Sequence, residues 1–279
     1  MKIRVITSII ALVVFICVLL APPIVFTLAL SAVILFMLYE CYRATKADMA
    51  MKIVGLASAI MMIYTVGRGF AVLNAMVTIF LIAVIAFIIL MYMALVIIEH
   101  GRKGYKEILS NAFLTLYLVI SMGSIWLARE LYGTLTMLLI FICAWATDTS
   151  AYFAGRFFGK HKLIPRVSPN KTVEGSIGGI IGAAAVCVIY FLIAHKISPS
   201  GFNMLRNINS YYIFVAIYGV LGGLLSQAGD LAASAIKRDS DIKDFGWIFP
   251  GHGGFMDRFD SVMYIAPILH LLMMIFTLI

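Results

Sequence analysis

Long apolar runs separated by short polar stretches make up most of this chain. A helix needs about 20 apolar residues to cross a bilayer core that is about 30 Å thick. The runs that approach this length are residues 5–20, 23–39, 53–71, 74–98, 111–128, 131–147, 176–195, 211–230 and 262–279. The pattern predicts an all-α fold, a polytopic bundle of about nine transmembrane helices.

Composition agrees with this interpretation. Hydrophobic residues make up 63% of the chain and charged residues 12%, whereas a soluble domain is about 25% charged. The first apolar run, with Lys2 and Arg4 before it, has the form of a signal peptide, but further apolar runs follow it. We therefore expect a retained first helix or an uncleaved signal anchor. The four cysteines are scattered and predict neither a disulfide framework nor a zinc site.

Lys and Arg are divided unequally between the two sides of this predicted bundle. With nine helices and a cytosolic N-terminus, 17 of the 21 fall on the cytosolic side, and the others are Arg68, Arg129, Lys196 and Arg206. Cytosolic loops of membrane proteins carry such an excess, so the N-terminus is expected in the cytosol. The net charge of +8 follows from this topology and requires no nucleic-acid partner.

Two polar stretches, residues 148–175 and 230–261, lie on the predicted cytosolic side and contain eight of the 13 acidic residues. We expect one membrane domain in two parts. Residues 1–140 would form N-terminal transmembrane helices, and residues 141–279 would form C-terminal transmembrane helices whose cytosolic loops carry the chemistry. Pairs such as Gly175/Gly179 and Gly219/Gly223 have the spacing of close helix contacts. Packing within the bundle is favoured for them, and a homodimer is the alternative.

Carboxylates lie next to the ends of these apolar runs. Asp148 and Asp230 follow a run, and Asp257 and Asp260 precede one. Ionisable groups at this depth are costly and usually functional. Two facing carboxylates would hold Mg²⁺ together with substrate phosphates, which makes Asp230 and Asp257 the predicted ligands and Asp260 a further candidate. Capping of a helix N-terminus is the rival interpretation for Asp257 and Asp260.

Cations and glycines surround these acids. The cations are Lys237, Arg238, Lys243 and Arg258, which suit phosphate binding. The alternative is that they only belong to the general excess of Lys and Arg on the cytosolic side. The segment Pro250–Gly254 contains three glycines, and successive N–H groups of such a loop can bind an anion. His252 would donate to a phosphate, contact a nucleotide or cap a helix. Lys171 and Thr172 precede a predicted helix start, which is a natural anion site.

Residues 234–260 read Ser-x-Ile-Lys-Arg-x4-Lys-Asp-x-Gly-x2-Phe-Pro-x-His-Gly-Gly-Phe-x-Asp-Arg-Phe-Asp. This segment resembles the signature of the phosphatidate cytidylyltransferase (CDP-diacylglycerol synthase) family, bacterial type. Ser-Pro-Asn-Lys-Thr-Val-Glu-Gly at 168–175 and Gln-Ala-Gly-Asp at 227–230 also resemble that family. The likeness is sharp over residues 145–265, and before residue 140 it consists only of apolar helices.

The resemblance implies a nucleotidyltransferase of the cell membrane that condenses CTP with phosphatidate to give CDP-diacylglycerol and pyrophosphate. It implies Mg²⁺ and leaves room for a second cation; the partners would be CTP, phosphatidate and membrane lipid, on the cytosolic side. The catalytic residues would be Asp230, Asp257, Lys237, Arg238 and Arg258. The substrate-binding residues would be Ser234, Lys243, Asp244, His252, Gly253, Gly254, Lys171, Thr172 and Asp148.

Two other functions compete with this one. A CTP-dependent lipid kinase, such as dolichol kinase, would transfer the terminal phosphoryl group of CTP instead of the cytidylyl group. A transporter would also use intramembrane acids and glycine-broken helices. That class predicts acids near the middle of the membrane, whereas most acids of this chain flank the apolar runs.

Overall fold

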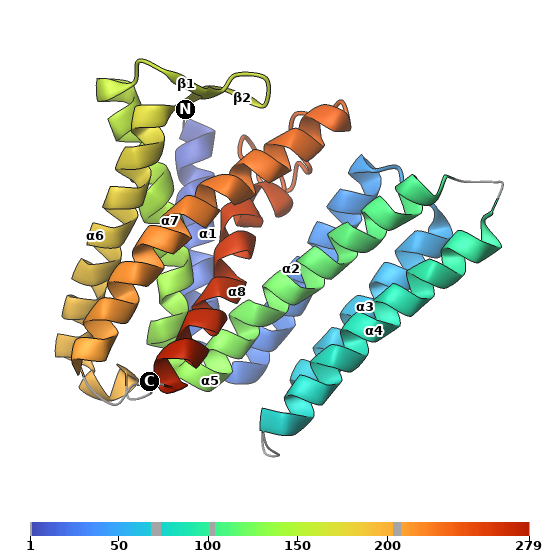
Figure 1. Cartoon of the computed structure of the whole chain (residues 1–279), viewed down its shortest axis with the longest axis horizontal. Coiled ribbons are helices and arrows are strands. Elements are labelled where there is room, and N and C mark those ends of the chain that lie inside the picture. The colour runs from blue at the N-terminus through green and yellow to red at the C-terminus, as the bar shows by residue number, and fades with distance from the viewer. Residues whose placement is uncertain (1, 68–73, 101–103, 203–207, 279) are drawn as a thin grey trace. The chain divides into compact units, whose positions relative to one another are not determined.

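Figure 1 shows a chain that is almost entirely helical. The computed structural model describes residues 2–67, 74–100, 104–202 and 208–278. Arg68, Arg102, Lys103 and Arg206 lie outside the described residues, so the charge pattern at these positions stays a prediction. The helices are α1 Lys2–Leu20, α2 Pro23–Ala44, α3 Met49–Gly67, α4 Asn74–Ile98, α5 Tyr105–Phe158, α6 Val173–Ile197, α7 Ile208–Asp239 and α8 Met256–Leu278.

The membrane character of the fold is confirmed in the described residues. There, five helices are long and apolar enough to cross a bilayer, namely α2, α5, α6, α7 and α8. Shorter apolar stretches occupy Thr7–Leu20, Met49–Ile63 and Ile82–Ile98. The number of crossings and the side on which the N-terminus lies stay predictions.

The 54-residue helix α5 contains one break, at Gly133. This residue has φ of 81° and ψ of 166°, a conformation that L-residues with a side chain rarely adopt. The break lies two residues inside the second of the two runs predicted at 111–128 and 131–147. The second piece continues to Phe158, well beyond the end of its apolar run.

A small β-hairpin was not predicted by the all-helical interpretation. Strand β1 (Lys162–Ile164) pairs antiparallel with β2 (Ser168–Thr172), with Lys162 opposite Thr172 and Ile164 opposite Ser168. A short 3₁₀ helix, η1, covers Pro199–Phe202. The hairpin covers the polar residues 162–172 and leads directly into α6.

The chain divides into two compact units. One contains residues 1–126 and 242–258, and the other contains residues 127–241 and 259–279. The C-terminal loop 242–255 thus packs with the N-terminal helices. That residues 141–279 carry the chemistry, and residues 1–140 do not, stays a prediction.

In the unit formed by residues 127–241 and 259–279, small residues let α6 approach its neighbours closely. A Cβ atom placed on Gly219 of α7 would lie 2.6 Å from the Cα of Ala184, and one on Gly175 of α6 would lie 2.9 Å from the carbonyl oxygen of Ala151. These glycines therefore serve helix packing within the chain, as predicted. The homodimer stays a prediction.

Candidate active site

Asp230 lies inside α7 and faces two polar side chains. The Nζ of Lys171, on β2, is 2.6 Å from Oδ2 of Asp230. The hydroxyl of Ser234, one turn further along α7, donates to Oδ1 at 3.4 Å. The apolar run ends at Asp230 but the helix does not, because the Leu-Ala-Ala-Ser-Ala-Ile sequence that follows favours helix and extends α7 to Asp239.

Two other predicted acids belong to the same unit as Asp230. Asp260, in the first part of α8, is 9% exposed, and its carboxylate interacts electrostatically with Asp230, Asp148 and Lys237. A Cβ on Gly229 would lie 2.6 Å from the carbonyl oxygen of Asp260, so α7 and α8 meet beside Asp230. Asp148 is exposed on α5 and, like Asp230, lies inside its helix rather than at the end.

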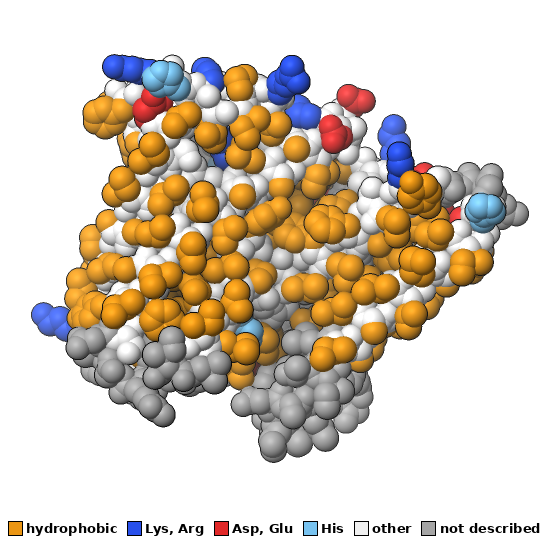
Figure 2. All heavy atoms as spheres, in the orientation of Figure 1, with side chains coloured by type: hydrophobic (Ala, Val, Ile, Leu, Met, Phe, Trp, Pro, Cys, Tyr) orange, Lys and Arg blue, Asp and Glu red, His pale blue; other side chains and the backbone are white. Residues whose placement is uncertain are grey.

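The hairpin holds Lys171 in place next to α7. Thr172 is the N-cap of α6, where its hydroxyl accepts from the N–H of Gly175 at 3.1 Å. Glu174, in the first turn of α6, accepts from the backbone N–H groups of Lys160 at 3.0 Å and His161 at 3.2 Å. Around the hairpin and the end of α7, charged side chains gather above a hydrophobic helical surface (Figure 2). This arrangement is typical of the polar end of a membrane bundle.

Asp257 occupies a different environment, in the unit of residues 1–126 and 242–258. It is 8% exposed in the first turn of α8. Its Oδ2 accepts from the N–H of Phe245 at 2.8 Å and from that of Gly254 at 2.9 Å. The carboxylate therefore ties both ends of the loop 245–254 to the start of α8.

The glycine loop itself is folded around this carboxylate. Gly253 has φ of 83°, and a Cβ there would lie 2.6 Å from Oδ2 of Asp257. The N–H of Gly254, predicted to contribute to an anion nest, is instead directed at Asp257. His252 has its Nε2 3.1 Å from the hydroxyl of Ser8 on α1.

The remaining predicted residues are accessible to solvent. Arg238, Lys243, Asp244 and Arg258 have exposed side chains, and Lys237 is half-buried. The structure thus groups Asp148, Lys171, Asp230, Ser234, Lys237 and Asp260 within one unit, and Lys243, Asp244, His252, Asp257 and Arg258 within the other. The pairing of Asp230 with Asp257 around one cation stays a prediction.

Sequence reasoning missed Glu40, which lies near the end of α2. This side chain is 1% exposed, and its carboxylate accepts from the N–H groups of Phe255 at 3.1 Å and Met256 at 2.9 Å. The signal was present, since Glu40 is the first acidic residue of the chain and directly follows the apolar run 23–39. A buried ionisable residue at such a place indicates function by default.

A model of the cytidylyltransferase family matches residues 2–276. The chain belongs to this family. It is 30% identical to a phosphatidate cytidylyltransferase of Bacillus subtilis (strain 168), with 99% of each chain covered. It is 32% identical to one of Staphylococcus aureus (strain COL) and 33% identical to one of Staphylococcus saprophyticus, with 98% of this chain and 99% of the relative covered in both. The resemblance, which is sharp over residues 145–265, therefore extends over almost the whole chain.

Cytidylyltransferases act on a triphosphate, so the fit of these residues to Mg²⁺ matters. Among the described residues, no group of three His, Cys, Asp or Glu side chains could hold a metal ion. Mg²⁺ does not need one, because it is usually bound by one or two carboxylates together with water and substrate phosphates. The ammonium group at 2.6 Å from Asp230 indicates that this carboxylate already attracts a cation. The residues therefore fit a magnesium ion that arrives with the nucleotide.

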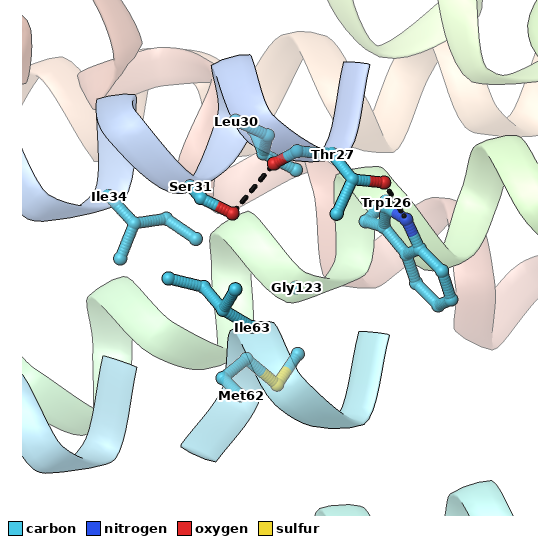
Figure 3. Close-up of a pocket in the computed structure, with 8 residues that line it drawn as sticks. All are labelled: Thr27, Leu30, Ser31, Ile34, Met62, Ile63, Gly123 and Trp126. Atoms are coloured by element: carbon cyan, nitrogen blue, oxygen red, sulfur yellow. Dashed lines mark hydrogen bonds between the residues drawn. The ribbon is translucent and has the colours of Figure 1, made fainter. Parts of the chain in front are cut away.

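A small hollow lies elsewhere, among α2, α3 and α5. It is lined by Thr27, Leu30, Ser31, Ile34, Met62, Ile63, Gly123 and Trp126 (Figure 3). The hydroxyl of Thr27 accepts from the indole N–H of Trp126 at 3.1 Å. No charged side chain lines this hollow, so it does not suit a triphosphate.

Proposed function

We propose that this protein transfers the cytidylyl group of CTP to phosphatidate, giving CDP-diacylglycerol and pyrophosphate. The observation that carries the proposal is the family match over residues 2–276, with relatives named phosphatidate cytidylyltransferase aligned over almost their full length. The clustering of acids and cations in residues 148–175 and 230–261 supports it from the chemistry of the chain itself.

In this reaction a phosphate oxygen of phosphatidate attacks the α-phosphorus of CTP. The bond from the α-phosphorus to its bridging oxygen breaks, and pyrophosphate leaves with the electron pair. The second pKa of a phosphate monoester is about 6, so the nucleophile is already ionised near neutral pH and needs no general base. The protein must instead bring two polyanions together in line and neutralise their charge.

Cationic side chains supply part of that neutralisation. Lys171 and Lys237 lie in the same unit as Asp230, and Arg238 follows Lys237 at the exposed end of α7. We assign Lys171 to the phosphates of CTP, and Lys237, Arg238, Lys243 and Arg258 to the pyrophosphate and the phosphatidate headgroup. Lys171 would exchange its contact with Asp230 for one with a phosphate when the nucleotide binds.

Asp230 and Asp257 would hold Mg²⁺, and Asp260 is the candidate ligand of a second cation. The metal would neutralise the triphosphate and orient its α-phosphorus. Ser234 supports Asp230 by donating to it, and the backbone N–H groups at Phe245 and Gly254 hold Asp257 in one orientation. The backbone contacts fix the carboxylate of Asp257 before substrate arrives.

The site would face the cytosol from the cell membrane, where CTP is soluble and the tails of phosphatidate stay in the bilayer. The excess of Lys and Arg on the side of the polar loops supports this orientation, with nine crossings and a cytosolic N-terminus. The five long apolar helices found among the described residues support a multi-pass location.

The test uses purified protein, Mg²⁺ and phosphatidate with CTP that carries label either in cytidine or in the γ-phosphate. We expect cytidine label in the lipid and γ-label in pyrophosphate. Entry of γ-label into the lipid would instead identify a lipid kinase, and solute flux without any use of CTP would identify a transporter.

A further inference from the structure

Glu40 is the least exposed acid of the described residues, and the reaction outlined above does not use it. An isolated buried carboxylate is costly unless hydrogen-bond donors satisfy it. Here its two oxygens each accept from one backbone N–H group, those of Phe255 and Met256. These amides lie where α8 begins, so Glu40 satisfies donors that the helix itself leaves free.

The surrounding chain is shaped to admit this carboxylate. A Cβ atom on Gly246 or on Gly254 would overlap the carboxylate of Glu40. One turn further along α2, Arg43 donates from Nη2 to the carbonyl oxygen of Phe245 at 2.6 Å. Two side chains of α2 therefore hold the loop at three places, namely Phe245, Phe255 and Met256.

The contacts of Glu40 and Asp257 interlock. Asp257 accepts from Phe245 and Gly254, and Glu40 accepts from the two residues that follow Gly254. Asp257 is the next residue after Met256, so its direction depends on how the first turn of α8 is held. A shift of that turn would move the carboxylate of Asp257 with it.

We propose that Glu40 is a positioning residue for cytidylyl transfer: seated between Gly246 and Gly254, its carboxylate fixes the start of α8 and thereby the direction of Asp257. This inference rests on the proposed function. It adds to the active centre a residue of the N-terminal helices that touches no substrate. It also explains why positions 246 and 254 are glycine, since a side chain at either would overlap the carboxylate of Glu40.

Glu40→Gln is the sharpest substitution, because the amide keeps the size of the side chain but offers one acceptor and turns a donor toward a backbone N–H. Glu107→Gln is the matched control, since Glu107 is exposed in the first turn of α5. Glu40→Asp retains the charge but is one methylene shorter. The full-length proteins would be purified and compared below the unfolding temperature of each.

Three readouts separate positioning from simple stabilisation. These are kcat and KM for CTP, the affinity for Mn²⁺ in the presence of CTP measured by electron paramagnetic resonance, and hydrogen exchange of the amides at 245–256. Loss of a partner behind a metal ligand typically costs about 10–100-fold in metal affinity or activity. We expect Glu40→Gln to lower Mn²⁺ affinity and kcat/KM by about that factor and to speed exchange at 255–256. Glu40→Asp should fall between it and wild type, and Glu107→Gln should match wild type.

The inference is overturned if folded Glu40→Gln protein keeps wild-type kinetics and Mn²⁺ affinity, even when its melting temperature is lower. Should Glu40→Gln not fold, Glu40→Asp decides the question in the same way. The wild-type protein separates the two proposals, because absence of CDP-lipid from wild type refutes the function, whereas an active wild type with an unaffected Glu40→Gln refutes only the positioning role.

Discussion

Asp230 and Asp257 were predicted to perform the same task, yet the structure surrounds them differently. Asp230 is half-buried, and its carboxylate contacts two side chains, those of Lys171 and Ser234. Asp257 is 8% exposed, and its partners are backbone N–H groups of the loop. Side-chain partners can be exchanged for a ligand at little cost, whereas backbone partners are part of the fold. The comparison indicates that Asp230 is ready for a ligand and that Asp257 also holds its loop together.

Replacement of Asp230 by Asn gives the largest expected loss of activity. The substitution removes charge where the triphosphate and its metal would bind, and loss of such an electrostatic group costs about 10²–10³-fold in rate. The melting temperature should stay near that of wild type, because the ion pair with Lys171 is partly exposed. The measurement is CDP-lipid synthesis beside a melting curve, with Asp239→Asn at the exposed end of α7 as control.

Asp257→Asn should reduce activity by about 10²-fold and, unlike Asp230→Asn, should also destabilise the protein. The amide cannot accept from both backbone N–H groups as well as a carboxylate does, and loss of such bonds costs about 1–3 kcal/mol. Denaturation in detergent, followed for both variants under one condition, checks this difference. Equal stabilities of Asp230→Asn and Asp257→Asn would remove the distinction between the two sites.

Lys171→Met should have a smaller effect, about a tenfold rise in KM for CTP, which corresponds to about 1.4 kcal/mol of binding free energy. The substitution removes a cation assigned to phosphate while it leaves Asp230 accessible. Stability should change by less than about 1 kcal/mol, since the ion pair is partly exposed. Lys160→Met, in the same region but exposed, serves as control. An unchanged KM for CTP would show that Lys171 does not contact the nucleotide.

Glu174→Gln gives the smallest expected change. This substitution weakens the contacts of Glu174 with the backbone N–H groups of Lys160 and His161 and with Nδ1 of His161, so the hairpin β1–β2 should open more often. Limited proteolysis should cleave between residues 159 and 172 faster than in wild type, while CTP turnover falls only slightly. Cleavage at the wild-type rate would mean that the hairpin is held by other contacts.

The helices could be predicted from the sequence because an apolar run long enough to span lipid has few alternatives to helix. Their ends could not. An apolar run ends where the lipid ends, but backbone hydrogen bonds continue through polar residues, so Asp148 and Asp230 lie inside helices. The partners of Glu40 could not be predicted either, since they are backbone groups more than 200 positions away in the chain.

The sequence predicted which residues belong to the candidate site, but it predicted only some of the contacts between them. Motif and charge pattern identified Lys171, Asp230 and Asp257, and the structure adds that the first two are paired. The role of Asp257 as an acceptor for loop amides has no sequence signal, because it depends on the fold of the Gly251–Gly254 turn.

The central claim is that Asp230 and Asp257 hold one divalent cation together with CTP. Crystals of the full-length protein, grown with Mn²⁺ and a CTP analogue that cannot react, would locate the metal by anomalous scattering. The account predicts a Mn²⁺ ion bound to carboxylate oxygens of both residues and to the triphosphate. A triphosphate-bound metal that contacts only one of the two, or neither, would contradict it.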